Sequence, residues 1–201
     1  MNKKRLSPKQ QEKRNQILTS AIRLFAQNGF TSTTVSDIAK NAGVSFGTVF
    51  TYFENKEALF EAAIIEPLMD FDSVFTRHEI NEKPITEQLE GIIEEQIMFM
   101  AEHRDYLQLI QQVLGQPAKF PNLLERLDQY FARMLKDLVP FIEKGQENHE
   151  LSTGDPELIG ASYISFLIGV RLTFTDLGLS EVWKSLIPQA LRLFGPIKLG
   201  G

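Results

Sequence analysis

The chain has 201 residues, and its 43% hydrophobic content is enough to build a folded core and excludes an intrinsically disordered chain. It contains no cysteine, which excludes disulfides, thiolate metal sites and a cysteine nucleophile, and this composition fits a reducing cytoplasm. The net charge of −5 argues weakly against a nucleic-acid ligand for the chain as a whole.

The start of the chain is basic but does not have the pattern of a signal peptide. Polar residues 7–16 follow the basic residues 1–6, where a signal peptide would place an apolar stretch. The most apolar run, residues 164–170, falls far short of the roughly 18 apolar residues that a membrane span needs. We therefore expect a soluble, cytoplasmic protein that does not interact with a membrane.

Helical periodicity begins near residue 17. Apolar residues recur at three- and four-residue spacing from Ile17 to Phe25, and Gly29 stands where this helix should end. Thr33 or Thr34 can cap a short second helix, and Ser45 can cap a short third one after a tight turn.

Six further helices are predicted after residue 54. Asn55 caps one that runs to about residue 78, with a kink at Pro67, and Asp155-Pro156-Glu157 starts an apolar helix over 156–176. The others are expected over about 84–102, 104–114, 123–142 and 180–194. Because no segment alternates like a strand, the sequence predicts an all-α fold of about nine helices.

Charge is divided unevenly along the chain. Residues 1–60 hold nine Lys or Arg and four Asp or Glu, a net +5, whereas residues 61–201 hold twelve and 22, a net −10. This asymmetry suggests a basic module for a polyanion joined to an acidic module with another role. A solvated basic tail on an ordinary domain explains the charge equally well.

Residues 33–53 have the pattern of a helix-turn-helix motif. Gly43 lets the backbone bend sharply between two short amphipathic helices. The second of them turns Val49 inward and exposes hydroxyl side chains and a helix N-terminus, which suits the major groove of DNA, and Phe46 is placed to pack on a thymine methyl group. A plain helical hairpin with polar residues outside is an equally good explanation of this pattern alone.

Residues 13–60 resemble the N-terminal domain of TetR-family (TetR/AcrR-like) repressors over about a quarter of the chain. The resemblance is carried by a long spaced pattern: Ile17-Leu18-x-x-Ala21, Leu24-Phe25, Gly29-Phe30-x-x-Thr33-Thr34-Val35, Ile38-Ala39, Ala42-Gly43-Val44-Ser45-x-Gly47-x-Val49-Phe50-x-Tyr52-Phe53 and Lys56-Glu57-x-Leu59-Phe60.

The resemblance implies a DNA-contacting surface. In it Tyr52 and Lys56 would hold phosphates, Thr48 and Thr51 would approach bases, and Gly47 would let the backbone come close. Phe46 and Phe50 depart from the family, where the first position is often basic or small and the second is often tyrosine. The implied DNA-binding residues are Thr34, Ser45, Phe46, Gly47, Thr48, Phe50, Thr51, Tyr52 and Lys56. The basic residues Lys3, Lys4, Arg5 and Lys9 either add DNA contacts or form a solubilising tail.

The chain is thus predicted to divide into a DNA-binding domain over 1–60, with the helix-turn-helix at about 34–53, and a ligand-binding and dimerisation domain over 61–201. The resemblance favours a homodimer built from the last two helices, which would match a palindromic operator. Burial of these helices inside one chain is the alternative. The predicted interface residues are Ile164, Ile168, Phe174, Trp183, Ile187 and Leu191.

Aromatic residues and methionines crowd the middle of the chain, and at helical spacing such residues more often form a core than a ligand site. A cavity lined by them would nevertheless suit a small hydrophobic effector. Arg171 would either face an anionic ligand or pair with Asp176 or a partner's acid. The candidate ligand-binding residues are Phe75, Phe99, Tyr106, Tyr130, Met134, Phe166 and Arg171.

The sequence lacks the patterns of an enzyme. His78, His103 and His149 have no metal-ligand spacing, and there is no nucleophile elbow, phosphate loop or dinucleotide fingerprint. We expect no catalysis, no metal and no cofactor. The resemblance implies a transcriptional regulator, by family default a repressor, in which an effector tilts the helix that starts near Lys56 and so releases DNA. The alternative is a helical small-molecule carrier without specific DNA binding.

Overall fold

The structure is a computed structural model that describes residues 6–173 and 181–195, apart from the side chains of 70–77, 171 and 172. Over these residues the chain forms nine α-helices and one 3₁₀ turn, so the predicted all-α fold is confirmed. None of the described helices has the length and hydropathy to cross a bilayer. The helices are Pro8–Ser32 (α1), Val35–Asn41 (α2), Phe46–Tyr52 (α3), Lys56–Arg77 (α4), Ile85–Glu102 (α5), Arg104–Leu114 (α6), Pro121–Glu147 (α7), Pro156–Thr173 (α8) and Glu181–Leu191 (α9), followed by the 3₁₀ turn Arg192–Phe194 (η1).

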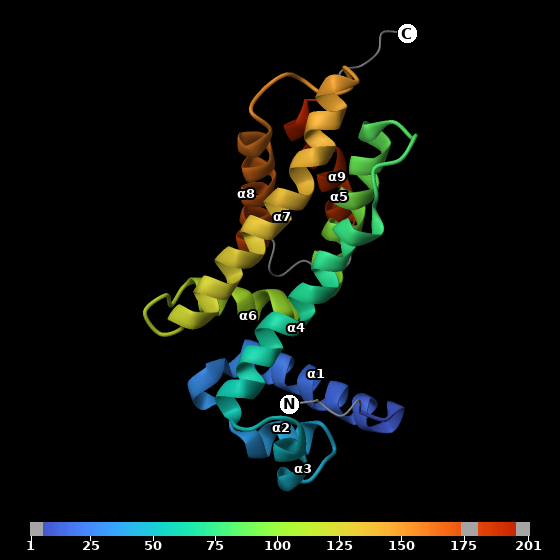
Figure 1. The fold of residues 1–201 in the computed structure, drawn as a ribbon. Coiled ribbons are helices and arrows are strands. Elements are labelled where there is room, and N and C mark those ends of the chain that lie inside the picture. The colour runs from blue at the N-terminus through green and yellow to red at the C-terminus, as the bar shows by residue number, and fades with distance from the viewer. Residues whose placement is uncertain (1–5, 174–180, 196–201) are drawn as a thin grey trace.

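Helices α1, α2 and α3 gather at one end of an elongated molecule (Figure 1). Helix α4 leads away from this end toward a second group, in which α5 packs on α9 and α7 packs on α8. Helix α6 lies between the two groups and packs against α1. The end formed by α1, α2 and α3 therefore connects to the rest of the molecule through α4 and α6.

Glycine and hydroxyl residues set the boundaries of the N-terminal helices. Gly29 has a φ of +77° and a ψ of 166°, a conformation that only glycine adopts readily, and it interrupts α1 where the sequence predicted an end. The interruption leaves helix carbonyls in need of donors, and the Gln112 side chain of α6 donates to the Ala26 carbonyl at 2.7 Å. The Thr33 hydroxyl donates to the Leu24 and Gly29 carbonyls, which fixes the entry into α2.

An aromatic cluster joins the N-terminal helices to the remainder of the chain. Phe60 of α4 lies edge-on to Phe25 and Phe30 of α1, with ring centres 5.0 and 4.8 Å apart. Phe120, just before α7, lies 5.1 Å from Phe60. This cluster straddles residue 60, the predicted domain boundary.

A buried polar pair lies in the second group of helices. Tyr163 of α8 is fully buried, and its hydroxyl donates to the Gln96 side-chain oxygen of α5 at 2.6 Å. Burial raises the pKa of the Tyr163 phenol far above its ordinary value, so this hydroxyl stays protonated and acts as a donor. The pair ties α5 to α8 through the core.

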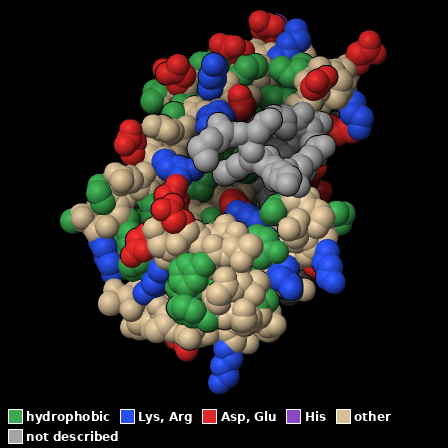
Figure 2. Space-filling view, turned by 60° about the horizontal axis from the view of Figure 1, so that its bottom comes forward, with side chains coloured by type: hydrophobic (Ala, Val, Ile, Leu, Met, Phe, Trp, Pro, Cys, Tyr) green, Lys and Arg blue, Asp and Glu red, His purple; other side chains and the backbone are tan. Residues whose placement is uncertain are grey.

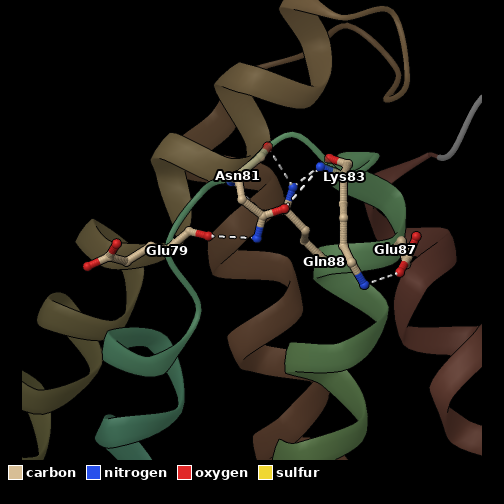
Figure 3. Close-up of polar contacts among 5 residues, drawn as sticks. All are labelled: Glu79, Asn81, Lys83, Glu87 and Gln88. Atoms are coloured by element: carbon tan, nitrogen blue, oxygen red, sulfur yellow. Dashed lines mark hydrogen bonds and ion pairs between the residues drawn. The ribbon is translucent and has the colours of Figure 1, made fainter.

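The connection from α4 to α5 is held by one buried glutamine (Figure 3). The Gln88 side chain donates to the backbone carbonyls of Lys83, at 2.6 Å, and Asn81, and it accepts from the Asn81 amide. Lys83 also pairs with Glu87 one turn along α5, at 2.6 Å. Because these bonds anchor the loop to α5, the end of α4 is tied to the second group of helices.

Most of the residues predicted for the dimer interface lie in the core of the single chain. Ile164, Trp183 and Ile187 are buried within the single chain, since α9 packs on α5 and α8 packs on α7. Ile168 and Leu191 are half-buried against the same core, and Phe174 lies outside the described residues. The apolar side chains of these helices are thus buried largely by their own chain.

Candidate nucleic-acid interface

Helices α2 and α3 form the predicted helix-turn-helix. The Thr34 hydroxyl accepts from the Asp37 amide and the Asp37 carboxylate bonds back to Thr34, which makes a capping box at the start of α2. After α2, Gly43 takes a φ of +66° with no atom near a would-be Cβ, so the turn geometry alone explains a glycine here. The Ser45 hydroxyl then caps α3 by accepting from the Thr48 amide at 3.2 Å.

The inner side of α3 is held by two buried side chains. Val49 is buried in the core, and Phe53, directly after the helix, lies beneath the Arg14 guanidinium at 4.8 Å. Arg14 also bonds to Glu66 of α4 with both of its terminal nitrogens, and Glu66 raises the pKa of Arg14. These contacts fix the orientation of α3 against α1 and α4, and they commit Arg14, one of the basic residues of this module, to an internal ion pair.

The outer side of α3 is exposed and uncharged. Phe46 and Phe50 are 54% and 42% exposed, Gly47 and Thr51 are exposed, and Thr48 and Tyr52 are half-buried. Turned toward the viewer, this end of the molecule shows a patch of hydrophobic side chains within uncharged surface, and Lys and Arg side chains stand around it (Figure 2). Six of the predicted DNA-binding residues therefore share one short helix, directly after its cap, Ser45.

The remaining two predicted residues, Thr34 and Lys56, lie outside α3 and bond within the chain. The Thr34 hydroxyl donates to Asp37 at 2.5 Å, so its first role is that of a helix cap. The Lys56 ammonium donates to the Thr31 carbonyl at 3.4 Å and lies 4.4 Å from the Phe30 ring centre. Of the basic tail, Lys9 is exposed on α1, whereas Lys3, Lys4 and Arg5 lie outside the described residues.

Sequence reasoning missed the contact between Phe46 and Phe50. Their ring centres lie 5.0 Å apart in an edge-to-face arrangement. The available signal was their spacing of four residues, which places two side chains next to each other on one helical face.

A second candidate site lies in the other part of the molecule, between α4, α5, α6, α7 and α8. It is an apolar cavity of about 70 Å³, and its described lining contains no charged residue. The structure brings four candidate ligand residues to it: Phe99, Tyr106, Tyr130 and Met134. Phe166 does not line it, and the side chains of Phe75 and Arg171 lie outside the described residues.

Two sets of lining residues were not predicted for this cavity. Helix α6 contributes Leu107, Ile110 and Leu114, and Ile164 and Ile168, predicted for the dimer interface, line the cavity instead. The periodicity of α6 shows an apolar face but not that this face meets a gap in packing. Elsewhere in the described part of the chain, no three His, Asp or Glu side chains gather as a metal site would require.

The helix-turn-helix with its exposed recognition helix defines a DNA-binding transcriptional regulator, and comparisons with known proteins agree. Residues 17–63 match the family "Bacterial regulatory proteins, tetR family". The chain is 30% identical to the HTH-type transcriptional regulator YvdT of Bacillus subtilis over 150 residues, covering 73% of this chain and 74% of YvdT. It is 26% identical to YvkB of the same organism over 89% of this chain and 93% of YvkB.

The fold also matches that of solved structures of regulators. The fatty acid degradation regulator FadR of Bacillus halodurans superposes with a TM-score of 0.73 at 20% identity, over 97% of this chain and 99% of FadR. The chain belongs to the TetR family of bacterial transcriptional regulators.

Proposed function

We propose that the protein represses transcription by binding as a homodimer to a palindromic operator, and that a small hydrophobic effector releases it. The observation that carries this proposal is helix α3, which is anchored by Val49 while Phe46, Phe50 and Thr51 are turned to solvent. Residues 1–60 would form the DNA-binding domain and residues 61–201 the ligand-binding and dimerisation domain.

The recognition helix would enter the major groove with its N-terminal turn against the DNA backbone. Gly47 supports this orientation, because a Cβ at this position would meet no atom within 4 Å. The fold therefore does not require glycine at this position. A phosphate that approaches the backbone closely would require it, because any side chain would stand in its way. Tyr52 and Lys56 would bind phosphates, since a phosphate is a stronger partner for the Lys56 ammonium than the Thr31 carbonyl at 3.4 Å.

The outward positions of α8 and α9 are proposed as the part of the dimer interface that is exposed in the single chain. Leu158 is 67% exposed at the start of α8, and Val182 is exposed on α9. Between them, Ser162 and Ser165 expose short side chains on α8, which allow another helix to approach closely. A two-fold axis through this surface would place two copies of α3 on the two halves of a palindrome.

The apolar cavity is the proposed effector site. Ligand pockets are usually roughly 300–1,000 Å³, so a ligand entering a cavity of about 70 Å³ must push its walls apart. An aliphatic chain suits a lining without charged residues, and the FadR fold match supports fatty acids as the first compounds to test.

Tyr106 is the proposed link between the cavity and the DNA-binding end. Its ring lines the cavity, and its buried hydroxyl donates to the Ile64 carbonyl of α4 at 2.8 Å. Pro67, with no N–H to donate to the Ala63 carbonyl, already weakens α4 beside this point. A ligand that displaces Tyr106 would therefore move α4 where the helix bends most easily. By linkage, ligand and DNA must then oppose each other reciprocally.

We expect Tyr106→Phe to weaken this coupling. The variant keeps the ring but loses one hydrogen bond, which is equivalent to about 2–10-fold in an equilibrium constant. The ratio of the DNA dissociation constants with and without ligand should fall by this factor for whichever compound of a fatty acid series releases DNA from the native protein. Fluorescence anisotropy of labelled operator measures the ratio. An unchanged ratio would remove Tyr106 from the pathway.

The function itself is tested by selecting binders from random duplex DNA at near-physiological salt. We expect a palindromic winner that is preferred over scrambled DNA by roughly a thousandfold or more. The competing function, a helical carrier without specific DNA binding, predicts weak, salt-sensitive binding and no enriched sequence. Enrichment of a non-palindromic site would retain the regulator but contradict the symmetric dimer.

A further inference from the structure

Phe46 and Phe50 are exposed aromatic side chains without a structural role in the described chain. Both point away from the core, and neither packs against the buried cluster that holds α3. Their rings contact each other at 5.0 Å with an interplanar angle of 68°. Leaving two phenyl rings in water is unfavourable, so a surface that covers them in the bound state is the natural explanation.

The other side chains of α3 limit which features of a base pair the helix can recognise. The helix contains no Arg, Lys, Asn or Gln, the side chains that read guanine or adenine in pairs of hydrogen bonds. Its serine and threonine hydroxyls already bond within the motif: Ser45 lies 2.7 Å from Thr48, and Thr51 donates to the Gly47 carbonyl at 3.4 Å. The hydroxyl of Tyr52, at the far end of the helix, is the one proposed above to bind a phosphate. The main groups that α3 can present to bases are therefore the apolar rings of Phe46 and Phe50.

The major groove has one apolar feature, the C5-methyl group of thymine. We propose that Phe46 and Phe50 are the specificity-determining residues of α3, and that they pack on the methyl groups of thymines in two neighbouring base pairs of each half-site. The ring spacing of 5.0 Å is comparable with one base step, whose rise is about 3.4 Å before the offset from helical twist. The inference rests on the proposed DNA-binding function and adds what the operator must contain.

The test replaces each thymine of the selected operator by deoxyuridine, which removes only the methyl group. We expect binding to weaken about fourfold for each contacted methyl, the factor that corresponds to burying one CH₂ group. Full substitution of both half-sites should multiply these factors, and single substitutions should place the sensitive positions in neighbouring base pairs.

The protein side of the test uses Phe46→Ala and Phe50→Ala, measured with thymine and deoxyuridine operators. Each variant should bind the thymine operator more weakly and should lose the discrimination at its own position, while its melting temperature stays close to that of the native protein. Met69→Ala is the matched control, because Met69 is an exposed apolar side chain on α4, 67% exposed and outside the recognition helix. It should keep the full discrimination.

Three outcomes would overturn the proposal. Equal binding of thymine and deoxyuridine operators by the native protein would show that no methyl group is read. Discrimination that persists in both phenylalanine variants would show that the methyl groups act through DNA shape. Failure to select any operator would contradict the proposed function as well, so it is distinguishable from the first two results, which contradict the methyl contact alone.

Discussion

Gly47→Glu is expected to abolish specific DNA binding while the protein stays folded. A side chain at position 47 meets nothing within 4 Å, so the fold has room for it. Position 47 also lies in the first turn of α3, directly after the Ser45 cap and Phe46, where an acidic side chain is favourable to the helix. Against DNA the same carboxylate meets phosphates, and we expect the affinity for the selected operator to fall at least about a hundredfold.

Gly47→Ala separates crowding from charge at this position. In a helix interior alanine is more stabilising than glycine by about 0.5–1 kcal/mol, and this is the upper limit for a first-turn position, so the melting temperature should rise by at most roughly 1–4 °C. The added methyl group should still weaken DNA binding, by an amount smaller than the glutamate does. Anisotropy titrations and thermal melts measure the two effects. If both variants bound the operator as the native protein does, α3 would not lie with this turn against DNA.

Tyr163→Phe is expected to destabilise the protein by about 1–3 kcal/mol, because it leaves the buried Gln96 oxygen without its donor at 2.6 Å. Gln96→Leu should cost a similar amount, since it leaves the Tyr163 hydroxyl unpaired in the core. Urea denaturation at fixed protein concentration measures both, and the concentration matters because the proposed dimer would add to the apparent stability.

The double variant Tyr163→Phe, Gln96→Leu provides the control. Replacing both partners by apolar groups removes the unpaired atom, so its loss of stability should be clearly smaller than the sum of the two single losses. Additive losses would mean that packing around Tyr163, and not the hydrogen bond, holds α5 to α8.

The local features of the N-terminal helices could be predicted because their signals are local. Gly29, Thr34, Gly43 and Ser45 act through backbone conformation and caps that depend on neighbouring residues only, and each lies at the predicted boundary. The apolar helix α8 was also found, yet its burial did not reveal which neighbour buries it. Ile164 and Ile168 line the apolar cavity. This depends on how α6 and α7 pack against α8, which the spacing of apolar residues along one helix does not indicate.

The aromatic cluster of Phe25, Phe30, Phe60 and Phe120 has a consequence for how separable the DNA-binding end is. In a fragment of residues 1–60, Phe60 would lose its contact with Phe120 and would become exposed. Phe25, which packs against Phe60, would then be less well buried, so the fragment would lose much of its stability. The whole chain should then melt in one cooperative transition. A hybrid regulator that combines residues 1–60 of one relative with the remainder of another would also have to include the start of α4, and the residues of α6 and Phe120 that face α1. If α3 sets operator preference as proposed, substitutions on α3 would change it, whereas residues 1–60 could not be moved as a unit between relatives without these contacts.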